Sequence, residues 1–175
     1  ITNLVKIVQK NVLTAEEVSD IGIEALNFAE EKRGGVAQCA VFYLLMIVRN
    51  EGHIDGHVDR NRFIDLLFDG GRDENDDVCE KAMSTLDMCM SGGKFPSDRS
   101  EELISVVLEA LQRRNPRIRG AATGTLVEFV RRGSQLTMSA SDAERVLEIT
   151  WTLLFEDDTM IPRCNSAMVL SEMFG

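Results

Sequence analysis

A pattern that returns about every 40 residues constrains the fold of this chain more than any other feature. Four segments begin with an apolar residue after a polar turn and continue with small or apolar residues at helical spacing. Their starts are separated by 42, 40 and 43 residues, and the segments are 36–44, 78–86, 118–126 and 161–169. A period of this length is typical of chains in which helical units stack on one another.

The repeated segments share two positions. In the first three, alanine stands four residues after the start and leucine eight residues after it. Residues at these spacings share one helix face, so we predict that they form the core: Val36, Ala40, Leu44, Val78, Ala82, Leu86, Ile118, Ala122 and Leu126. The fourth segment fits less well. If it starts at Ile161, Asn165 takes the alanine position, and a shift of its register by one residue stays open.

Each repeated segment follows another predicted helix with its own start signal. Thr14 and Glu17 have the spacing of a capping box. The other candidate caps are Asp55 or Asp59 for a helix to about Phe68, Ser97 or Ser100, and Ser139 or Ser141. Glycines mark the expected helix ends: Gly34-Gly35, Gly70-Gly71, Gly92-Gly93 and Gly133.

These signals predict a unit of helix, short turn and helix. We expect a single domain over 1–175 with repeats at 14–52, 53–93, 94–135 and 136–175. Residues 1–13 would be part of a preceding repeat, and the chain would be a fragment of a longer protein.

The clearest unit is Leu103–Arg132. Its apolar first helix is followed by Arg114-Asn115-Pro116-Arg117, and Ile118-Arg119 then opens a helix with Ala121 and Ala122. This arrangement resembles the HEAT-repeat family and, secondarily, its armadillo relatives. The resemblance implies an all-α fold, an α-solenoid of about four HEAT/ARM-like helical hairpins. It also implies that Arg119 ties neighbouring repeats together. Cys79 and Ala37 stand at the arginine position in two other units. A generic helical bundle is the alternative fold.

Charge and hydropathy exclude several classes of function. The net charge is −10, which opposes generic nucleic-acid binding. Residues 1–90 carry 9 basic and 17 acidic groups, and residues 91–175 carry 10 and 12. The densest apolar run, 44–48, is too short to cross a membrane. Four dispersed cysteines favour reduced thiols and a cytoplasmic or nuclear location.

No pattern predicts catalysis, a cofactor or a metal. His53, Asp55, His57 and Asp59 could ligate a metal, but Gly52 and Gly56 favour a solvated turn between helices. Residues 73–77 look like part of a calcium loop without its full register, and we interpret them as an exposed turn and helix cap.

Two other groups of side chains leave alternatives open. Six arginines, Arg113, Arg114, Arg117, Arg119, Arg131 and Arg132, either pair with neighbouring repeats or form a patch for an acidic peptide or phosphate. Met83, Met88 and Met90 either fill the core or line an adaptable groove.

The most favoured function is a protein–protein interaction scaffold, not an enzyme, that binds a protein or peptide on the concave surface lined by the second helices. Outward positions should include Gly120, Gly124 and Val127. The candidate partner-binding residues are Gln38, Phe42, Leu45, Glu80, Ser84, Asp87, Arg117, Arg119 and Arg163. A basic partner is expected near Glu80 and Asp87, and an acidic or phosphorylated one near Arg117 and Arg119.

Two other functions stay open. One is a HEAT-like enzyme, for which the resemblance suggests a DNA-repair glycosylase or a bilin lyase. The other is a spacer between domains.

Overall fold

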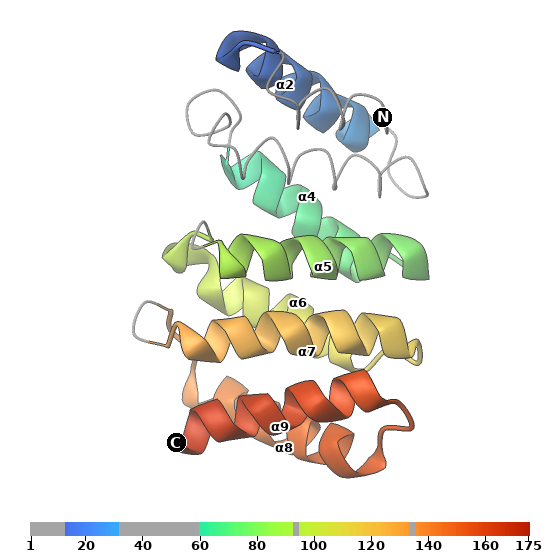
Figure 1. The fold of residues 1–175 in the computed structure, drawn as a ribbon, viewed down its shortest axis with the longest axis vertical. Helices are drawn as coiled ribbons and strands as arrows, with labels where there is room; N and C mark the ends of the chain where they lie inside the picture. Colours follow the sequence, from blue (N-terminus) through green and yellow to red (C-terminus); the bar gives the residue numbers. More distant parts are fainter. Residues whose placement is uncertain (1–12, 32–59, 93–94, 134–135) are drawn as a thin grey trace. The chain divides into compact units, whose positions relative to one another are not determined.

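The structure is a computed structural model that describes residues 13–31, 60–92, 95–133 and 136–175, and the regular secondary structure in these ranges is all helical. Contacts divide the chain into two compact units, Ile1–Thr85 and Leu86–Gly175. None of the described helices has the length and apolarity needed to cross a membrane. The helices in Figure 1 are α2 (Ala15–Glu31), α4 (Arg60–Arg72), α5 (Asp76–Ser91), η1 (Ser97–Arg99), α6 (Ser100–Leu111), α7 (Pro116–Arg131), α8 (Ala140–Glu156) and α9 (Met160–Phe174).

In the first unit, α2 begins with the predicted capping box. The Thr14 amide donates to Glu17 Oε2 at 2.8 Å, and the Glu17 amide donates back to Thr14 Oγ1 at 3.3 Å. Helix α2 contacts α4, where Arg62 donates to both carboxylate oxygens of Glu30 at 3.1 and 2.7 Å. The side chains buried in these two helices include Leu26, Ala29, Phe63, Ile64 and Leu67.

The turn from α4 to α5 corrects one predicted boundary. Helix α4 runs past the expected end at Phe68 to Arg72, and it contains Gly70 and Gly71. Both glycines are buried, and the Gly71 carbonyl accepts a hydrogen bond from Cys79 Sγ at 3.0 Å. Because a glycine has no side chain, the end of α4 can lie close to α5 here. The segment 73–77 forms the predicted turn and cap, in which Asn75 Oδ1 accepts from the Asp77 amide at 3.0 Å.

The second unit contains two helical pairs, α6 with α7 and α8 with α9, and α7 also lies against α9 (Figure 1). Asn115 caps α7 by accepting from the Arg117 amide, and Pro116 is its first residue, where the missing N–H costs nothing. Ser139 caps α8 by accepting from the Asp142 amide, as the sequence predicts.

The predicted core is confirmed wherever the structure describes it. Six positions are fully buried: Val78, Ala82, Leu86, Ile118, Ala122 and Leu126. Val36, Ala40 and Leu44 lie outside the described residues. Two residues expected to point outward are instead covered. Gly120 is buried against Ile161, whose Cγ2 lies 3.2 Å from the place of an added Cβ, and Val127 is 4% exposed.

The fourth segment starts one residue later than its apolar pattern suggested. Ile161 is 66% exposed, whereas Pro162, Ser166 and Leu170 are buried. These three match Ile118, Ala122 and Leu126 of α7, because the buried face requires the same i, i+4, i+8 spacing. In the corrected register, Arg163 occupies the position that Arg119 has in α7.

Candidate functional site

An acidic cluster lies around Gly124 of α7 in the second unit, where the last turn of α5 and helix α9 each bring a side chain close to this glycine. It comprises Asp87, Gly124 and Asn165 together with Glu128, whose charge acts on Asp87, and we call these four residues the acidic notch. The nearest atoms to the place of a Cβ on Gly124 are Asp87 Oδ2 at 3.4 Å and Cγ at 3.6 Å, followed by Asn165 Nδ2 at 3.8 Å. A Cβ at position 124 would already be in van der Waals contact with the carboxylate and the amide, so the glycine lets both side chains lie close to α7.

The electrostatics of the notch centre on Asp87. Burial raises the pKa of the Asp87 carboxyl, and the negative charge of Glu128 raises this pKa further. Its carboxylate has no hydrogen bond or ion pair within the described part of the chain. The side chain is half-buried, so the carboxylate is partly dehydrated without a compensating cation. A cation that approaches such a carboxylate stabilises it.

Asn165 is held firmly against α7. Its Nδ2 donates to the Gly120 carbonyl at 3.2 Å and to Thr123 Oγ1 at 3.3 Å. Thr123 Oγ1 in turn donates to the Gly120 carbonyl at 3.0 Å. The Asn165 side chain is therefore held in a fixed orientation before any partner binds.

Two arginines connect the C-terminal ends of the same helices. Arg131 of α7 contacts Glu128 at 3.0 Å and Glu172 of α9 at 3.0 Å. Arg132 Nη2 donates to the Ser91 carbonyl of α5 at 2.9 Å. Arg131 pairs with Glu128 but does not reach Asp87, so the charge of Asp87 stays uncompensated.

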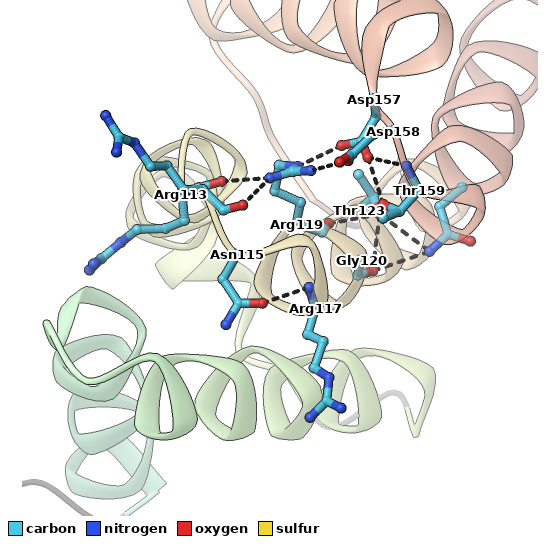
Figure 2. A network of polar contacts seen from close by, with 11 residues as sticks. Arg113, Asn115, Arg117, Arg119, Gly120, Thr123, Asp157, Asp158 and Thr159 are labelled. Atoms are coloured by element: carbon cyan, nitrogen blue, oxygen red, sulfur yellow. Dashed lines mark hydrogen bonds and ion pairs between the residues drawn. The ribbon is translucent and has the colours of Figure 1, made fainter.

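At the other end of α7, Arg119 forms a network that Figure 2 shows. Its Nε contacts Asp157 Oδ2 at 2.5 Å, and Nη2 contacts Asp158 at 3.4 Å. Its Nη1 donates to the carbonyls of Arg113 and Arg114 at 3.0 and 2.6 Å. The side chains of Arg119 and Asp157 are only 13% and 1% exposed. Arg119 therefore joins the end of α6 to the turn before α9.

The acid in this network has a strongly shifted pKa. Burial alone would raise the pKa of Asp157, but hydrogen bonds from Arg119 and from the side chain and amide of Thr159 outweigh burial and lower the pKa to about 2. Thr159 Oγ1 donates to Asp157 Oδ1 at 2.6 Å, and the Thr159 amide donates to it at 2.9 Å. The carboxylate is thus fully satisfied by its own chain.

The predicted partner-binding residues have different environments. Glu80 and Ser84 are half-buried on α5, in the part of this helix that belongs to the first unit. Arg117 is exposed, and Figure 2 shows its side chain directed away from the Arg119 guanidinium. Arg163 is exposed and donates from Nε to the Leu154 carbonyl at 3.0 Å. Gln38, Phe42 and Leu45 lie outside the described residues.

Of these candidates, the structure places Asp87 in the acidic notch. Arg117 and Arg163 lie near the starts of α7 and α9 and form no hydrogen bond or ion pair with Asp87. Every N–H-bearing nitrogen of Arg119 is already engaged, so Arg119 itself is not available to an acidic partner.

Sequence reasoning missed two residues of the notch, Glu128 and Asn165. Glu128 lies one turn beyond Gly124, so extending the predicted outward stripe by one turn would have included it. Asn165 takes the alanine position of the repeat if the fourth segment starts at Ile161, and this assignment hides it as a surface residue. The corrected start at Pro162 moves it out of the core position.

The remaining metal-ligating and sulfur-containing side chains form no further candidate site in the described residues. Within the ranges that the structure describes, no cluster of three or more His, Cys, Asp or Glu is arranged to hold a metal, and the segment His53–Asp59 lies outside those ranges. Met83 and Met90 are fully buried in α5, Cys79 and Cys89 are buried thiols, and Cys164 is an exposed one. Comparison of the chain with protein-family models, curated proteins and solved structures finds no match.

Proposed function

We propose that this protein is a HEAT-like α-solenoid scaffold that binds a partner protein on the surface of its second helices, with the acidic notch receiving a basic side chain. The environment of the Asp87 carboxylate is the observation that carries the proposal. This carboxylate is half-buried, pairs with no cation of the described residues, and lies beside a glycine that has no side chain of its own to cover it.

The chemistry of the notch favours arginine or lysine in the partner. A guanidinium or ammonium group over Gly124 would donate charge-assisted hydrogen bonds to Asp87 and lie near Glu128. The positive charge of the partner would offset the burial and the repulsion by Glu128 that together raise the pKa of Asp87. The net charge of −10 would add a long-range attraction for a basic partner.

The scaffold part of the proposal rests on the repeated pairs of helices. Helices α4, α6 and α8 begin at residues 60, 100 and 140, in agreement with the period of the sequence. Arg119 joins one helical pair of the second unit to the next through a buried ion pair. Stacking of this kind places successive second helices side by side, and together they form an extended binding surface.

The test is a titration with a fluorescein-labelled decapeptide of alternating arginine and serine, followed by fluorescence anisotropy at about 0.15 M salt, where long-range attraction is screened. Asp87→Asn should weaken binding about tenfold, which corresponds to about 1.4 kcal/mol. The matched control is Asp98→Asn, which makes the same charge change at an exposed residue of η1. It should change binding less than twofold.

A second variant tests the space of the notch independently of its charge. Gly124→Leu would place a bulky side chain against Asp87 and Asn165, and leucine is a better helix former than glycine, so the helix should persist. Binding of the same peptide should be lost. If Asp87→Asn and Asp98→Asn weaken binding equally, the peptide recognises only the net charge of the chain and the proposal is wrong.

A further inference from the structure

The pair α8–α9 repeats the surface with which α6–α7 holds its neighbour, but in α8–α9 this surface is uncovered. The corrected register aligns Arg163 of α9 with Arg119 of α7. Both arginines donate to backbone carbonyls at the end of the preceding helix, Arg119 to Arg113 and Arg114, and Arg163 to Leu154. Both guanidinium groups are therefore tied to the preceding helical segment, Arg119 through Nη1 and Arg163 through Nε.

The two arginines differ in what they meet next. Arg119 contacts Asp157 from the turn that precedes α9. Arg163 is exposed, and no carboxylate of the described residues pairs with it. It therefore holds the position of Arg119 without the acid that Arg119 binds.

Burial along the second helices shows the same difference. On α7, Gly120, Thr123 and Val127 are buried, and Ile161 and Asn165 of α9 contact the first two. The corresponding residues of α9 are all exposed: Cys164, Ala167 and Ser171. The face of α7 that α9 covers therefore corresponds to a face of α9 that is exposed.

The first helices agree with this comparison. Leu103, Val107 and Ala110 of α6 match the buried residues Val146, Thr150 and Leu153 of α8. In this alignment Leu108, which is fully buried in α6, corresponds to Trp151, which is 60% exposed. Trp151 is in ring contact with Phe155 at 5.1 Å between centroids, and Phe155 is 62% exposed. Exposed neighbouring aromatic rings of this size are typical of interaction sites.

We propose that this uncovered face, made of Trp151, Phe155, Arg163, Cys164, Ala167 and Ser171, binds a helical hairpin of a partner protein. The hairpin carries an aspartate or glutamate shortly before its second helix, and this carboxylate pairs with the Nη atoms of Arg163, whose Nε is held by the Leu154 carbonyl. An apolar residue in the first turn of that helix covers Cys164, as Ile161 covers Gly120. This proposal is independent of the acidic notch.

The test supplies such a hairpin directly. A second copy of residues 136–175 is joined to the C-terminus of the full chain by a flexible Gly/Ser linker, which gives a local concentration in the millimolar range. The added copy carries Trp151→Phe, so that fluorescence comes only from the original tryptophan, which is the single Trp of the chain. Acrylamide quenching then reports whether the uncovered face is occupied.

We expect the quenching constant of Trp151 to fall roughly twofold or more, because the corresponding Leu108 is fully buried. Arg163→Gln should restore most of the quenching, and so should Asp157→Asn in the added copy alone. The two substitutions combined should have little further effect, since they remove the same ion pair. Arg117→Gln, at another exposed arginine, is the matched control and should leave the protection unchanged.

Unchanged quenching in the extended chain would overturn the proposal. It would also be overturned if protection appeared but did not respond to Arg163→Gln, since the carboxylate would then have no role. Increased quenching would mean that the added hairpin had displaced the original α8–α9 pair, which equally contradicts docking on the uncovered face.

Discussion

At the scale of single residues, Asp87 has an environment that a purely structural carboxylate would not need. Its raised pKa means that the folded state favours the protonated form more than the unfolded chain does. Above this pKa, the ionised side chain therefore lowers the stability of the fold. A residue that opposes stability in this way is typical of a binding site.

Asp87→Asn should accordingly stabilise the free protein while it weakens binding of the basic peptide. Because Asp87 is only half-buried, the gain is reduced by solvent screening, and we expect the melting temperature to rise by about 1–2 °C at pH 7. Calorimetry of the variant beside Asp98→Asn measures the difference. A clear loss of stability in Asp87→Asn would show that the carboxylate supports the fold.

Ser166 offers a second test at this scale. It occupies the position of Ala122 in the corrected register, and its Oγ is the one fully buried side-chain polar atom without a hydrogen bond in the described residues. Ser166→Ala should therefore raise the free energy of unfolding by about 1 kcal/mol. Urea denaturation measures the gain, and Ser171→Ala, at an exposed residue of the same helix, should change it little. A loss of stability in Ser166→Ala would mean that the hydroxyl has a partner.

The ion pair of Arg119 with Asp157 predicts a pH dependence. The folded pKa of Asp157 is about 2, below its ordinary value of 3.8. The stabilisation is therefore complete above about pH 4 and is lost as the pH falls toward 2. The pKa difference corresponds to about 2 kcal/mol.

Urea denaturation between pH 5 and pH 2 should show that the wild type loses about 2 kcal/mol more than Asp157→Asn. Asp158→Asn, whose side chain is 86% exposed in the wild type, should keep the wild-type dependence. Parallel curves for the wild type and Asp157→Asn would contradict the assigned pKa.

At the scale of helices, the sequence was most informative where a structure depends on neighbouring residues. The caps at Thr14, Ser139 and the turn with Asn115 and Pro116 were readable, because each is a contact between residues close in the chain. The core of α5 and α7 followed from its spacing. The extension of α4 through Gly70 and Gly71 could not be predicted from the sequence, because it depends on how closely α5 approaches these glycines.

The candidate site was less predictable than the helices. Asp87 and Gly124 were named as outward residues, yet nothing in the sequence says that the carboxylate of one lies over the other. Their proximity depends on the packing of α5 against α7. The burial of Gly120 depends in the same way on Ile161 of α9, and the orientation of Asn165 depends on its hydrogen bonds to α7.

The repeat register itself can be tested in α7. Ala122 is fully buried, so Ala122→Asp would place an unpaired charge in the core at a cost of several kcal/mol. We expect the variant to lose its cooperative thermal transition in circular dichroism. Ala167→Asp, at an exposed position of α9, should keep it. A wild-type transition in Ala122→Asp would contradict the register.

At the scale of the whole molecule, the sequence predicted an all-helical protein, and the described residues confirm helices that pack against one another. The continuous solenoid and its binding function remain our proposals. They are supported by the period of the repeat, by the linkage through Arg119, and by the uncompensated carboxylate of Asp87.

The most direct test of the central claim is a nuclear magnetic resonance titration of the isotope-labelled chain with the arginine–serine decapeptide. We expect saturable shifts concentrated at the Gly124 backbone amide, the Asn165 side-chain amide and the Asp87 carboxyl carbon. The shift of that carbon should also show that binding lowers the pKa of Asp87. Shifts spread evenly over exposed acidic residues, with no change at Gly124 or Asp87, would contradict the account.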